Sequence, residues 1–195
     1  MHRAFTRGLT IIKRHLLALC AGTALTLASV ISIARGEDAT AGAVLKHYGD
    51  MAEAMYGDAH AASLDLGKAI DALIANPTNE TLVAVRRAWK EARPWYQHSE
   101  AYRFGNAIVD DWEGRVNSWP LDEGLIDYTD KQSYGETSDE NPLYTANVIA
   151  NTSIRIGNDV VDATRIDAEL LRKLQQAGGN EANVATGYHA IEFLL

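Results

Sequence analysis

The last nine residues of the sequence, positions 187–195, contain two side chains whose types and spacing could perform chemistry together. His189 and Glu192 are three positions apart, and residues at i and i+3 are neighbours on one face of a helix. An imidazole nitrogen and a carboxylate oxygen placed side by side can hold one metal ion. The same spacing also produces an ordinary hydrogen-bonded pair on a helix, so these two residues alone leave both interpretations open.

Two further stretches contain acidic residues that could join such a site. Glu100 precedes Arg103 by one helical turn, so the two residues form either a solvated surface pair or a buried anion held by its arginine. Asp122 comes shortly after Trp119-Pro120, and proline favours an extended conformation in the residue before it. Asp122 is then either a metal ligand or the N-cap of a short helix at residues 122–128.

Helices must position these residues, because apolar residues recur every three or four positions and no strand alternation of useful length is present. The pattern predicts one long amphipathic helix from Ala39 to Asn76 and a second from about Glu80 to Phe104, kinked at Pro94. The short link that contains Pro77 would turn the second helix antiparallel to the first, as in a bundle.

The rest of the chain is predicted to contain one loop and three shorter helices. Residues 105–141 are rich in Asp, Glu, Gly and Ser, and we expect a long ordered loop whose aromatic residues pack. Helices are predicted from Leu143 to about Val161, from Asp167 to Ala177 and from Glu181 onward. The predicted fold class is all-α, an up-and-down helical bundle with a long ordered loop, after an N-terminal signal segment.

The first 36 residues have the composition of a secretory signal. Residues 1–14 carry four basic residues and no acidic one, an apolar run extends from Leu16 to Ile33, and small residues follow it. We therefore expect a signal peptide over residues 1–36, a helical domain over residues 37–195, and export to the periplasm or cell envelope. Retention of the apolar run as a membrane anchor is the alternative.

The expected mature chain is acidic and contains no cysteine. Residues 1–36 hold five of the 18 basic residues and none of the 26 acidic ones, which leaves a net charge near −13. Such a surface repels nucleic acid and attracts cations, so nucleic acid is excluded as a partner. The one cysteine, Cys20, lies in the apolar run. An exported protein without disulfides depends on core packing or on a bound ion.

Three ordered blocks resemble the imelysin-like family, the group of the insulin-cleaving membrane protease and iron-regulated protein A. The blocks are Trp89-x-x-Ala92-Arg93-x-Trp95 leading to Glu100-x-Tyr102-Arg103-Phe104-Gly105, then Asn117-x-Trp119-Pro120-Leu121-Asp122-Glu123 with Ile126-Asp127-Tyr128, and finally Gly187-Tyr188-His189-Ala190-Ile191-Glu192-Phe193-Leu194-Leu195. The last block matches the family's Gly-x-His-x-x-Glu motif. The resemblance covers residues 89–195, and the first long helix also fits the family.

The resemblance implies an exported, helical, metal-binding protein involved in iron uptake or handling. His189 and Glu192 would be the family's metal pair, with Glu100 and Asp122 as further ligands nearby and Arg103 in support. One imidazole with several carboxylates is an oxygen-rich ligand set that suits iron or manganese better than zinc; iron is the expected metal, and zinc is the other candidate. The implied partners are the metal ion and envelope iron-transport proteins.

Two alternatives stay open at this point. A metallopeptidase of the same family would need a third protein ligand, an open coordination position and a base for water. The sequence has no His-Glu-x-x-His helix, and the residues favour a binding protein over an enzyme, with no catalytic residue assigned. Family chains usually continue for about another domain beyond the position of Leu195. The chain is therefore also expected to be truncated, lacking a second half-domain, and could be a non-functional fragment.

Overall fold

The computed structural model describes residues 40–136 and 138–195, so the expected signal peptide at residues 1–36 lies outside the described part. This part is mostly helical and contains one two-stranded sheet, which confirms the helical class predicted from the sequence. None of its helices is both long and apolar enough to cross a bilayer.

The chain divides into two compact units, Met1–Gly49 and Asp50–Leu195, and the boundary falls within helix α2 (Ala41–Ala75). Of the first unit the structure describes the beginning of this helix. There the hydroxyl of Thr40 accepts a hydrogen bond from the backbone N–H of Ala43 at 3.2 Å, which satisfies one free donor of the first turn. The contacts described below lie in the second unit.

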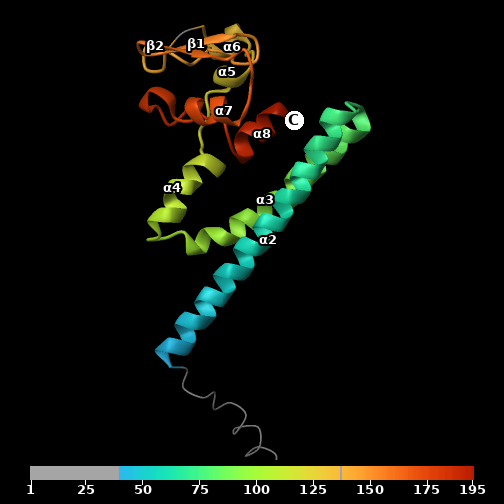
Figure 1. Cartoon of the computed structure of the whole chain (residues 1–195), viewed down its shortest axis with the longest axis vertical. Coiled ribbons are helices and arrows are strands. Elements are labelled where there is room, and N and C mark those ends of the chain that lie inside the picture. Colours follow the sequence, from blue (N-terminus) through green and yellow to red (C-terminus); the bar gives the residue numbers. More distant parts are fainter. Residues whose placement is uncertain (1–39, 137) are drawn as a thin grey trace, which may run out of the picture. The chain divides into compact units, whose positions relative to one another are not determined.

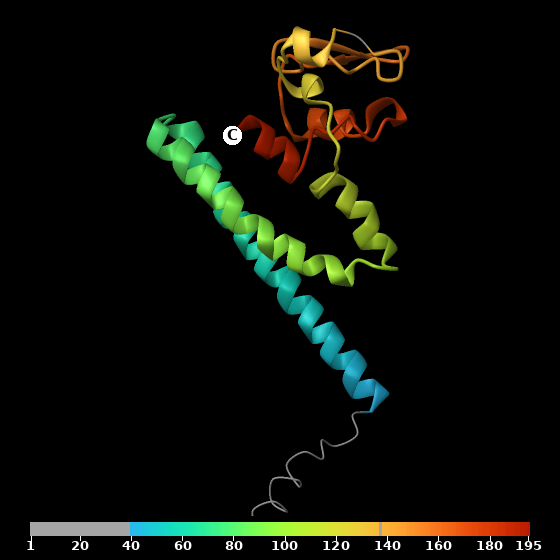
Figure 2. The ribbon, with the colours of Figure 1, turned by 180° about the vertical axis from the view of Figure 1, so that it is seen from behind.

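Helices α2 and α3 (Asn79–Ser99) form the hairpin that the sequence predicted. Figures 1 and 2 show α3 running back beside α2 and then turning away from it. Thr78 starts α3 with a reciprocal capping box, in which its side chain and that of Thr81 each accept from the other residue's backbone N–H. Pro94 lies inside α3, where its ring removes one backbone hydrogen bond and accounts for a bend.

The hairpin shares a core with the last helix, α8 (Tyr188–Leu194). The buried residues of this core are Leu66, Val85, Ala92, Tyr96 and Tyr188. The members from α3 are separated by seven and four positions, which places them on one face of the helix. Apolar packing against that face fixes the position of the helix that carries His189 and Glu192.

Residues 105–141, predicted as one long loop, contain three helices: α4 (Ala107–Val116), α5 (Glu123–Ile126) and α6 (Lys131–Tyr134). The loop prediction was therefore wrong, most clearly for α4. None of the residues of α4 is fully buried, and Ile108 exposes 83% of its surface. Val109, Trp112 and Val116 recur at steps of three and four positions, so a short helical signal was present among the acidic residues and was overlooked.

The helix predicted from Leu143 to Val161 is also wrong, because turns and an antiparallel hairpin occupy this segment. Strand β1 (Ser153–Ile156) pairs with β2 (Asp159–Asp162), and the first residue of β1 lies opposite the last residue of β2. Gly157 takes a φ of +58° in the two-residue turn between them. The dipeptide Gly157-Asn158 between two β-branched runs is a hairpin signal, and it outweighs the apolar spacing that had indicated a helix.

The helices near the end of the chain are shorter than predicted. The first is α7 (Ala168–Leu174), whose N-cap is Asp167, so the prediction for this helix is confirmed to within a few residues. The helix predicted from Glu181 onward is confined to α8. Residues before α8 are irregular because asparagine side chains bind the backbone there: Asn183 donates through Nδ2 to a backbone carbonyl oxygen at 2.7 Å, which competes with helix formation.

A second core holds the segment from α5 to the residues before α8. Its buried members are Leu125, Leu143, Val148, Ile154, Ala163, Leu170, Leu174, Ala177 and Ala185. A smaller cluster of Ile126, Val184 and Ala190 joins α5 to α8. Helix α8 therefore contacts both the helical hairpin and the second core.

Truncation of a core leucine should separate buried from exposed positions of the same residue type. Leu125 is fully buried, whereas Leu64 on α2 exposes 53% of its surface. We expect Leu125→Ala to lower the free energy of unfolding by about 2–5 kcal/mol, because it removes apolar contacts and leaves a cavity. Leu64→Ala should change it by less than about 0.5 kcal/mol. Urea unfolding followed by circular dichroism measures both, and equal effects would contradict the described core.

Candidate metal site at helix α8

Helix α8 begins directly after Gly187, where the chain passes close to the end of α4. Gly187 has a φ of +93°, and a β-carbon at this position would lie 2.5 Å from the carbonyl oxygen of Val116 and 2.9 Å from that of Arg115. Only glycine permits both this backbone conformation and this close approach. The glycine of the Gly-x-His-x-x-Glu motif therefore determines where α8 starts.

Polar contacts from α3 hold both ends of α8. Trp89 donates a hydrogen bond through Nε1 to the carbonyl oxygen of Tyr188 at 2.9 Å. Arg86 donates through Nε to the carbonyl oxygen of Leu195. The two donors are three positions apart and lie on the same side of α3. These contacts satisfy one carbonyl at each end of α8 and orient the helix that carries the candidate ligands.

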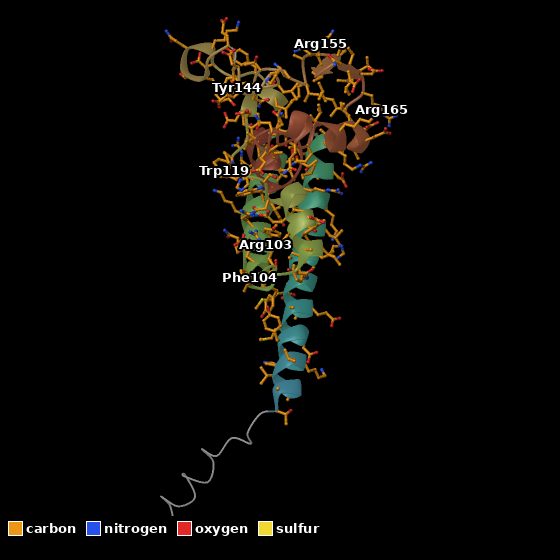
Figure 3. All side chains as sticks on the ribbon, turned by 90° about the vertical axis from the view of Figure 1, so that its left-hand side faces the viewer. Arg103, Phe104, Trp119, Tyr144, Arg155 and Arg165 are labelled. Carbon is orange, nitrogen blue, oxygen red and sulfur yellow. The ribbon has the colours of Figure 1, made fainter. Side chains whose placement is uncertain are left out.

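His189 and Glu192 form the pair that the sequence indicated. Nδ1 of His189 lies 3.0 Å from Oε2 of Glu192, and the two side chains expose 16% and 51% of their surfaces. The imidazole packs against the ring of Trp119, with 4.8 Å between the ring centroids. Trp119 itself is largely exposed (Figure 3). The imidazole is thus mostly covered, whereas the carboxylate is reachable from solvent.

Arg93 occupies the other edge of the imidazole. Its Nη2 lies 3.4 Å from Nε2 of His189. The guanidinium also lies over two aromatic rings, with Cζ 5.5 Å from the ring centroid of Tyr96 and 5.3 Å from that of Tyr188, which are favourable cation–π distances. Nη1 of Arg93 is buried and has no hydrogen-bond partner among the described residues.

These contacts favour one nitrogen of His189 as the carrier of the hydrogen. A guanidinium group can only donate, so Nε2 of His189 accepts from Arg93. The ring hydrogen then lies on Nδ1 and is donated to the carboxylate of Glu192. The imidazole of His189 therefore lies between the guanidinium of Arg93 and the carboxylate of Glu192.

Glu100 is not brought into this pair. It begins the 3₁₀ turn η1 (Glu100–Tyr102) and is exposed. Arg103 instead pairs with α4: its Nη1 lies 2.8 Å from Oε1 of Glu113, and its Nε lies 3.8 Å from Oδ1 of Asp110. Neither the solvated pair of Glu100 with Arg103 nor the buried anion is found among the described residues, because α4 supplies two carboxylates to Arg103 from a segment that had been predicted as a loop.

Asp122 belongs to a buried polar network. Its Oδ2 accepts a hydrogen bond from Nδ2 of Asn141, which also donates to Oδ1 of Asn183 at 2.7 Å. Asn141 and Asn183 are both buried. Asp122 occupies the N-cap position of α5, as one interpretation predicted, but its side chain makes no capping bond. The carboxylate connects α5 to the segment before α8.

Two metal-binding atoms therefore lie together, Nδ1 of His189 and Oε2 of Glu192. Within residues 40–136 and 138–195, no three His, Cys, Asp or Glu side chains are grouped closely enough to hold one ion. An imidazole nitrogen and a carboxylate oxygen 3.0 Å apart suit iron, manganese or zinc. The pair fits as two ligands of an ion that completes its coordination with water or other donors.

The sequence-based reasoning missed Arg93 and Trp119 as neighbours of His189. For Arg93 a signal existed, because it follows Trp89 by four positions and therefore shares the face of α3 that contacts α8. For Trp119 no local signal existed, because its contact depends on where the chain passes after α4.

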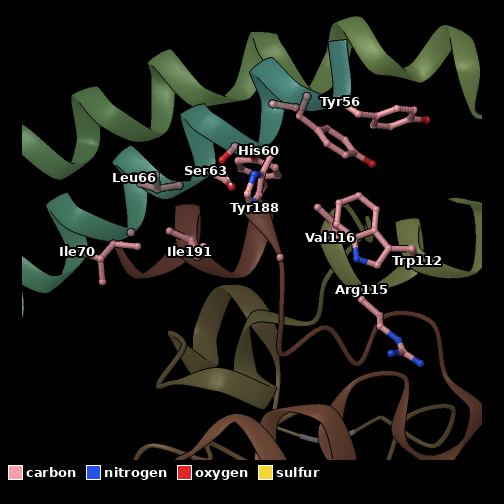
Figure 4. Close-up of a pocket in the computed structure, with 14 residues that line it drawn as sticks. Tyr56, His60, Ser63, Leu66, Ile70, Trp112, Arg115, Val116, Tyr188 and Ile191 are labelled. Atoms are coloured by element: carbon pink, nitrogen blue, oxygen red, sulfur yellow. Dashed lines mark hydrogen bonds between the residues drawn. The ribbon is translucent and has the colours of Figure 1, made fainter. Parts of the chain in front are cut away.

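A mainly apolar cavity of about 410 Å³ lies beside α8. Figure 4 shows residues of α2, α4 and α8 around it. Tyr188 and Ile191 line this cavity, whereas His189 and Glu192 do not. Helix α8 therefore presents separate sets of residues to the apolar cavity and to the candidate metal site.

Comparison with known proteins gives two findings. A family model described as imelysin, and labelled a peptidase, matches residues 52–195. Iron-regulated protein A of Synechococcus elongatus is 32% identical to the chain over 71 residues, which are 36% of this chain and 20% of that protein. The matched segment thus spans about a fifth of the relative's length.

Alanine at Gly187 should destabilise the fold more than alanine at another glycine with a positive φ. Gly157 has a φ of +58° and open space around it, whereas a β-carbon at Gly187 meets backbone atoms of α4. We expect Gly157→Ala to lower the free energy of unfolding by about 1 kcal/mol through backbone strain. Gly187→Ala should lower it by at least about 2 kcal/mol, because the chain must also shift. Urea unfolding compares the two, and equal losses would contradict the close approach.

Stability at alkaline pH should depend on Tyr96. Burial raises the pKa of Tyr96 to about 12, with the carboxylate of Glu113 as the second cause. The unfolded state has a tyrosine pKa of about 10, so the folded state holds the proton more tightly. The contribution of the Tyr96 proton to the free energy of unfolding is therefore complete below pH 10, and it is lost as the pH rises from about 10 to about 12.

Urea unfolding at about pH 9 and about pH 11.5 measures this effect against those two pKa values. We expect the wild type to lose up to about 2 kcal/mol more than Tyr96→Phe between these two pH values. The matched control is Tyr128→Phe, since Tyr128 exposes 71% of its surface. This control should lose as much stability as the wild type; a Tyr96→Phe variant that does the same would refute the role of Tyr96.

Proposed function

The chain belongs to the imelysin family, and we propose that it is an exported member that binds iron as cargo through His189 and Glu192. The observation that carries this proposal is the 3.0 Å pair of Nδ1 and Oε2 on α8. A relative whose name is iron-regulated protein A supports the choice of iron. The signal-like composition of residues 1–36 supports export to the periplasm or cell envelope, where iron-transport proteins would be the partners.

The pair would bind a cation in the place that one hydrogen occupies in the metal-free protein. His189 donates its Nδ1 hydrogen to Glu192; an ion that takes this place is bound by both side chains, and the imidazole keeps one hydrogen on Nε2. Half of the surface of Glu192 is exposed, so the ion has access from solvent. The excess of acidic residues over residues 37–195 raises the local concentration of cations. The ligand roles of Glu100 and Asp122 stay predictions.

Peptide hydrolysis is the second candidate, because the matching family is labelled a peptidase. A metallopeptidase needs an ion with an open position and a base that activates water. The described residues supply two ligands at α8 but no third carboxylate beside them. Binding therefore has more support than hydrolysis. Metal-dependent cleavage of casein that disappears in Glu192→Gln would favour the peptidase.

Calorimetric titration of Fe(II) under anaerobic conditions tests the proposed function. We expect His189→Ala and Glu192→Gln each to weaken binding by about tenfold or more, because each removes one of two protein ligands. His98→Ala is the matched control, since His98 is an exposed histidine of α3 and should leave binding unchanged. Glu100→Gln and Asp122→Asn show whether these acids contribute. Equal binding by the wild type, His189→Ala and Glu192→Gln would refute the proposal.

A further inference from the structure

The edge of His189 that faces away from Glu192 has an unusual neighbour. The guanidinium of Arg93 places Nη2 3.4 Å from Nε2 of the imidazole. The other terminal nitrogen of Arg93, Nη1, is buried and has no hydrogen-bond partner among the described residues. Without metal, this arrangement is favourable, because the lone pair of Nε2 accepts from Arg93 while the hydrogen of Nδ1 is donated to Glu192.

Metal binding at the pair would change the role of Nε2. The ion displaces the hydrogen from Nδ1, and the imidazole stays neutral by carrying its one hydrogen on Nε2 instead. Nε2 of His189 then directs an N–H toward Arg93, which also only donates. Two donors face each other at this edge, and the guanidinium carries a positive charge near the new cation. Binding of the metal alone is therefore opposed by Arg93.

We propose that Nε2 of His189 and the guanidinium of Arg93 form an anion site that appears when the metal binds, so that the cargo is a metal ion together with a small carboxylate or carbonate. This inference rests on the proposed function. An oxygen of the anion accepts hydrogen bonds from both donors, and its negative charge offsets the guanidinium. Metal and anion then bind cooperatively, each raising the affinity for the other.

Arg93 is held in place for this role. Its Cζ lies 5.5 Å and 5.3 Å from the ring centroids of Tyr96 and Tyr188, so leaving the site would sacrifice two cation–π contacts. The bond from Trp89 to the carbonyl of Tyr188 keeps α3 and α8 together one turn away. The two donors are therefore positioned before the anion arrives, which reduces the entropy lost on binding.

Binding of Mn(II) to the full chain tests the proposal, because the free ion is quantified directly by electron paramagnetic resonance. Titrations are made in sodium acetate and in sodium perchlorate at equal ionic strength. Acetate is a strong hydrogen-bond acceptor and perchlorate is a weak one. We expect acetate to tighten Mn(II) binding to the wild type by roughly tenfold, within the usual range of coupling between two sites.

The variant Arg93→Met keeps an apolar side chain between Tyr96 and Tyr188 but removes the charge and the donors. We expect it to bind Mn(II) with affinities within about twofold in the two salts, and more tightly than the wild type in perchlorate. The matched control is Arg87→Met, because Arg87 lies on the same helix with 73% of its side chain exposed. This control should retain the acetate effect. Circular dichroism melting verifies that both variants fold.

The outcomes separate the anion site from the metal pair. Equal Mn(II) affinity of the wild type in both salts, or an acetate effect that persists in Arg93→Met, overturns the anion site and leaves the proposed function standing. Absence of Mn(II) binding in both salts overturns both. If Arg93→Met fails to fold, equal wild-type affinity in the two salts still overturns the anion site, and the position of the hydrogen on His189 tests it independently.

Long-range ¹H–¹⁵N spectra with diamagnetic Zn(II) report the hydrogen on His189 directly. We expect it on Nδ1 in the metal-free protein and on Nε2 after addition of Zn(II) and acetate. A hydrogen that remains on Nδ1 although Zn(II) binds would show that Nδ1 is not a ligand, and it would overturn both the anion site and the metal pair of His189 and Glu192.

Discussion

The attachment of α8 to α3 is the constraint on which the candidate site depends. A helix of seven residues is too short to be stable alone, so its position comes from its contacts. Tyr188 packs with Val85, Ala92 and Tyr96 in one core, and its carbonyl oxygen accepts from Trp89. The imidazole that follows Tyr188 is therefore held at the face of α3 from which Arg93 projects.

The resulting environment gives His189 a defined electrostatic role. Glu192 accepts from one nitrogen and Arg93 donates to the other, so these contacts favour one place for the hydrogen of the ring. A cation bound at the pair would lie on the edge of the ring opposite to the guanidinium of Arg93. A ligand that takes the hydrogen from Nδ1 of His189 turns Nε2 from an acceptor into a donor, so binding at the two nitrogens is coupled.

The motif at the end of the chain combines a structural residue with two chemical ones. Gly187 permits the close approach of α8 to the carbonyl oxygen of Val116, and His189 and Glu192 supply the donor atoms one turn later. The family match includes this motif and most of the chain, whereas the match to iron-regulated protein A covers a fifth of that protein. The family assignment therefore rests on a match to residues 52–195, whereas the link to iron rests on a match of 71 residues.

The sequence by itself determined the features that depend on near neighbours. Helical periodicity predicted α2 and the start of α3 closely, although α3 ends at Ser99 and not at Phe104. The i, i+3 spacing placed His189 beside Glu192, because both follow from the local geometry of a helix. The short apolar repeat of α4 and the turn at Gly157-Asn158 were both overlooked, although their local signals were present.

Tertiary structure alone decided which distant side chains meet. Arg103 pairs with Glu113 rather than Glu100, and Asp122 binds Asn141 rather than joining the pair on α8. The contact of Arg93 with His189 spans 96 positions. The packing of α8 against α3 creates that contact, and no short-range pattern contains this information because charged side chains take whichever partner the fold brings within reach.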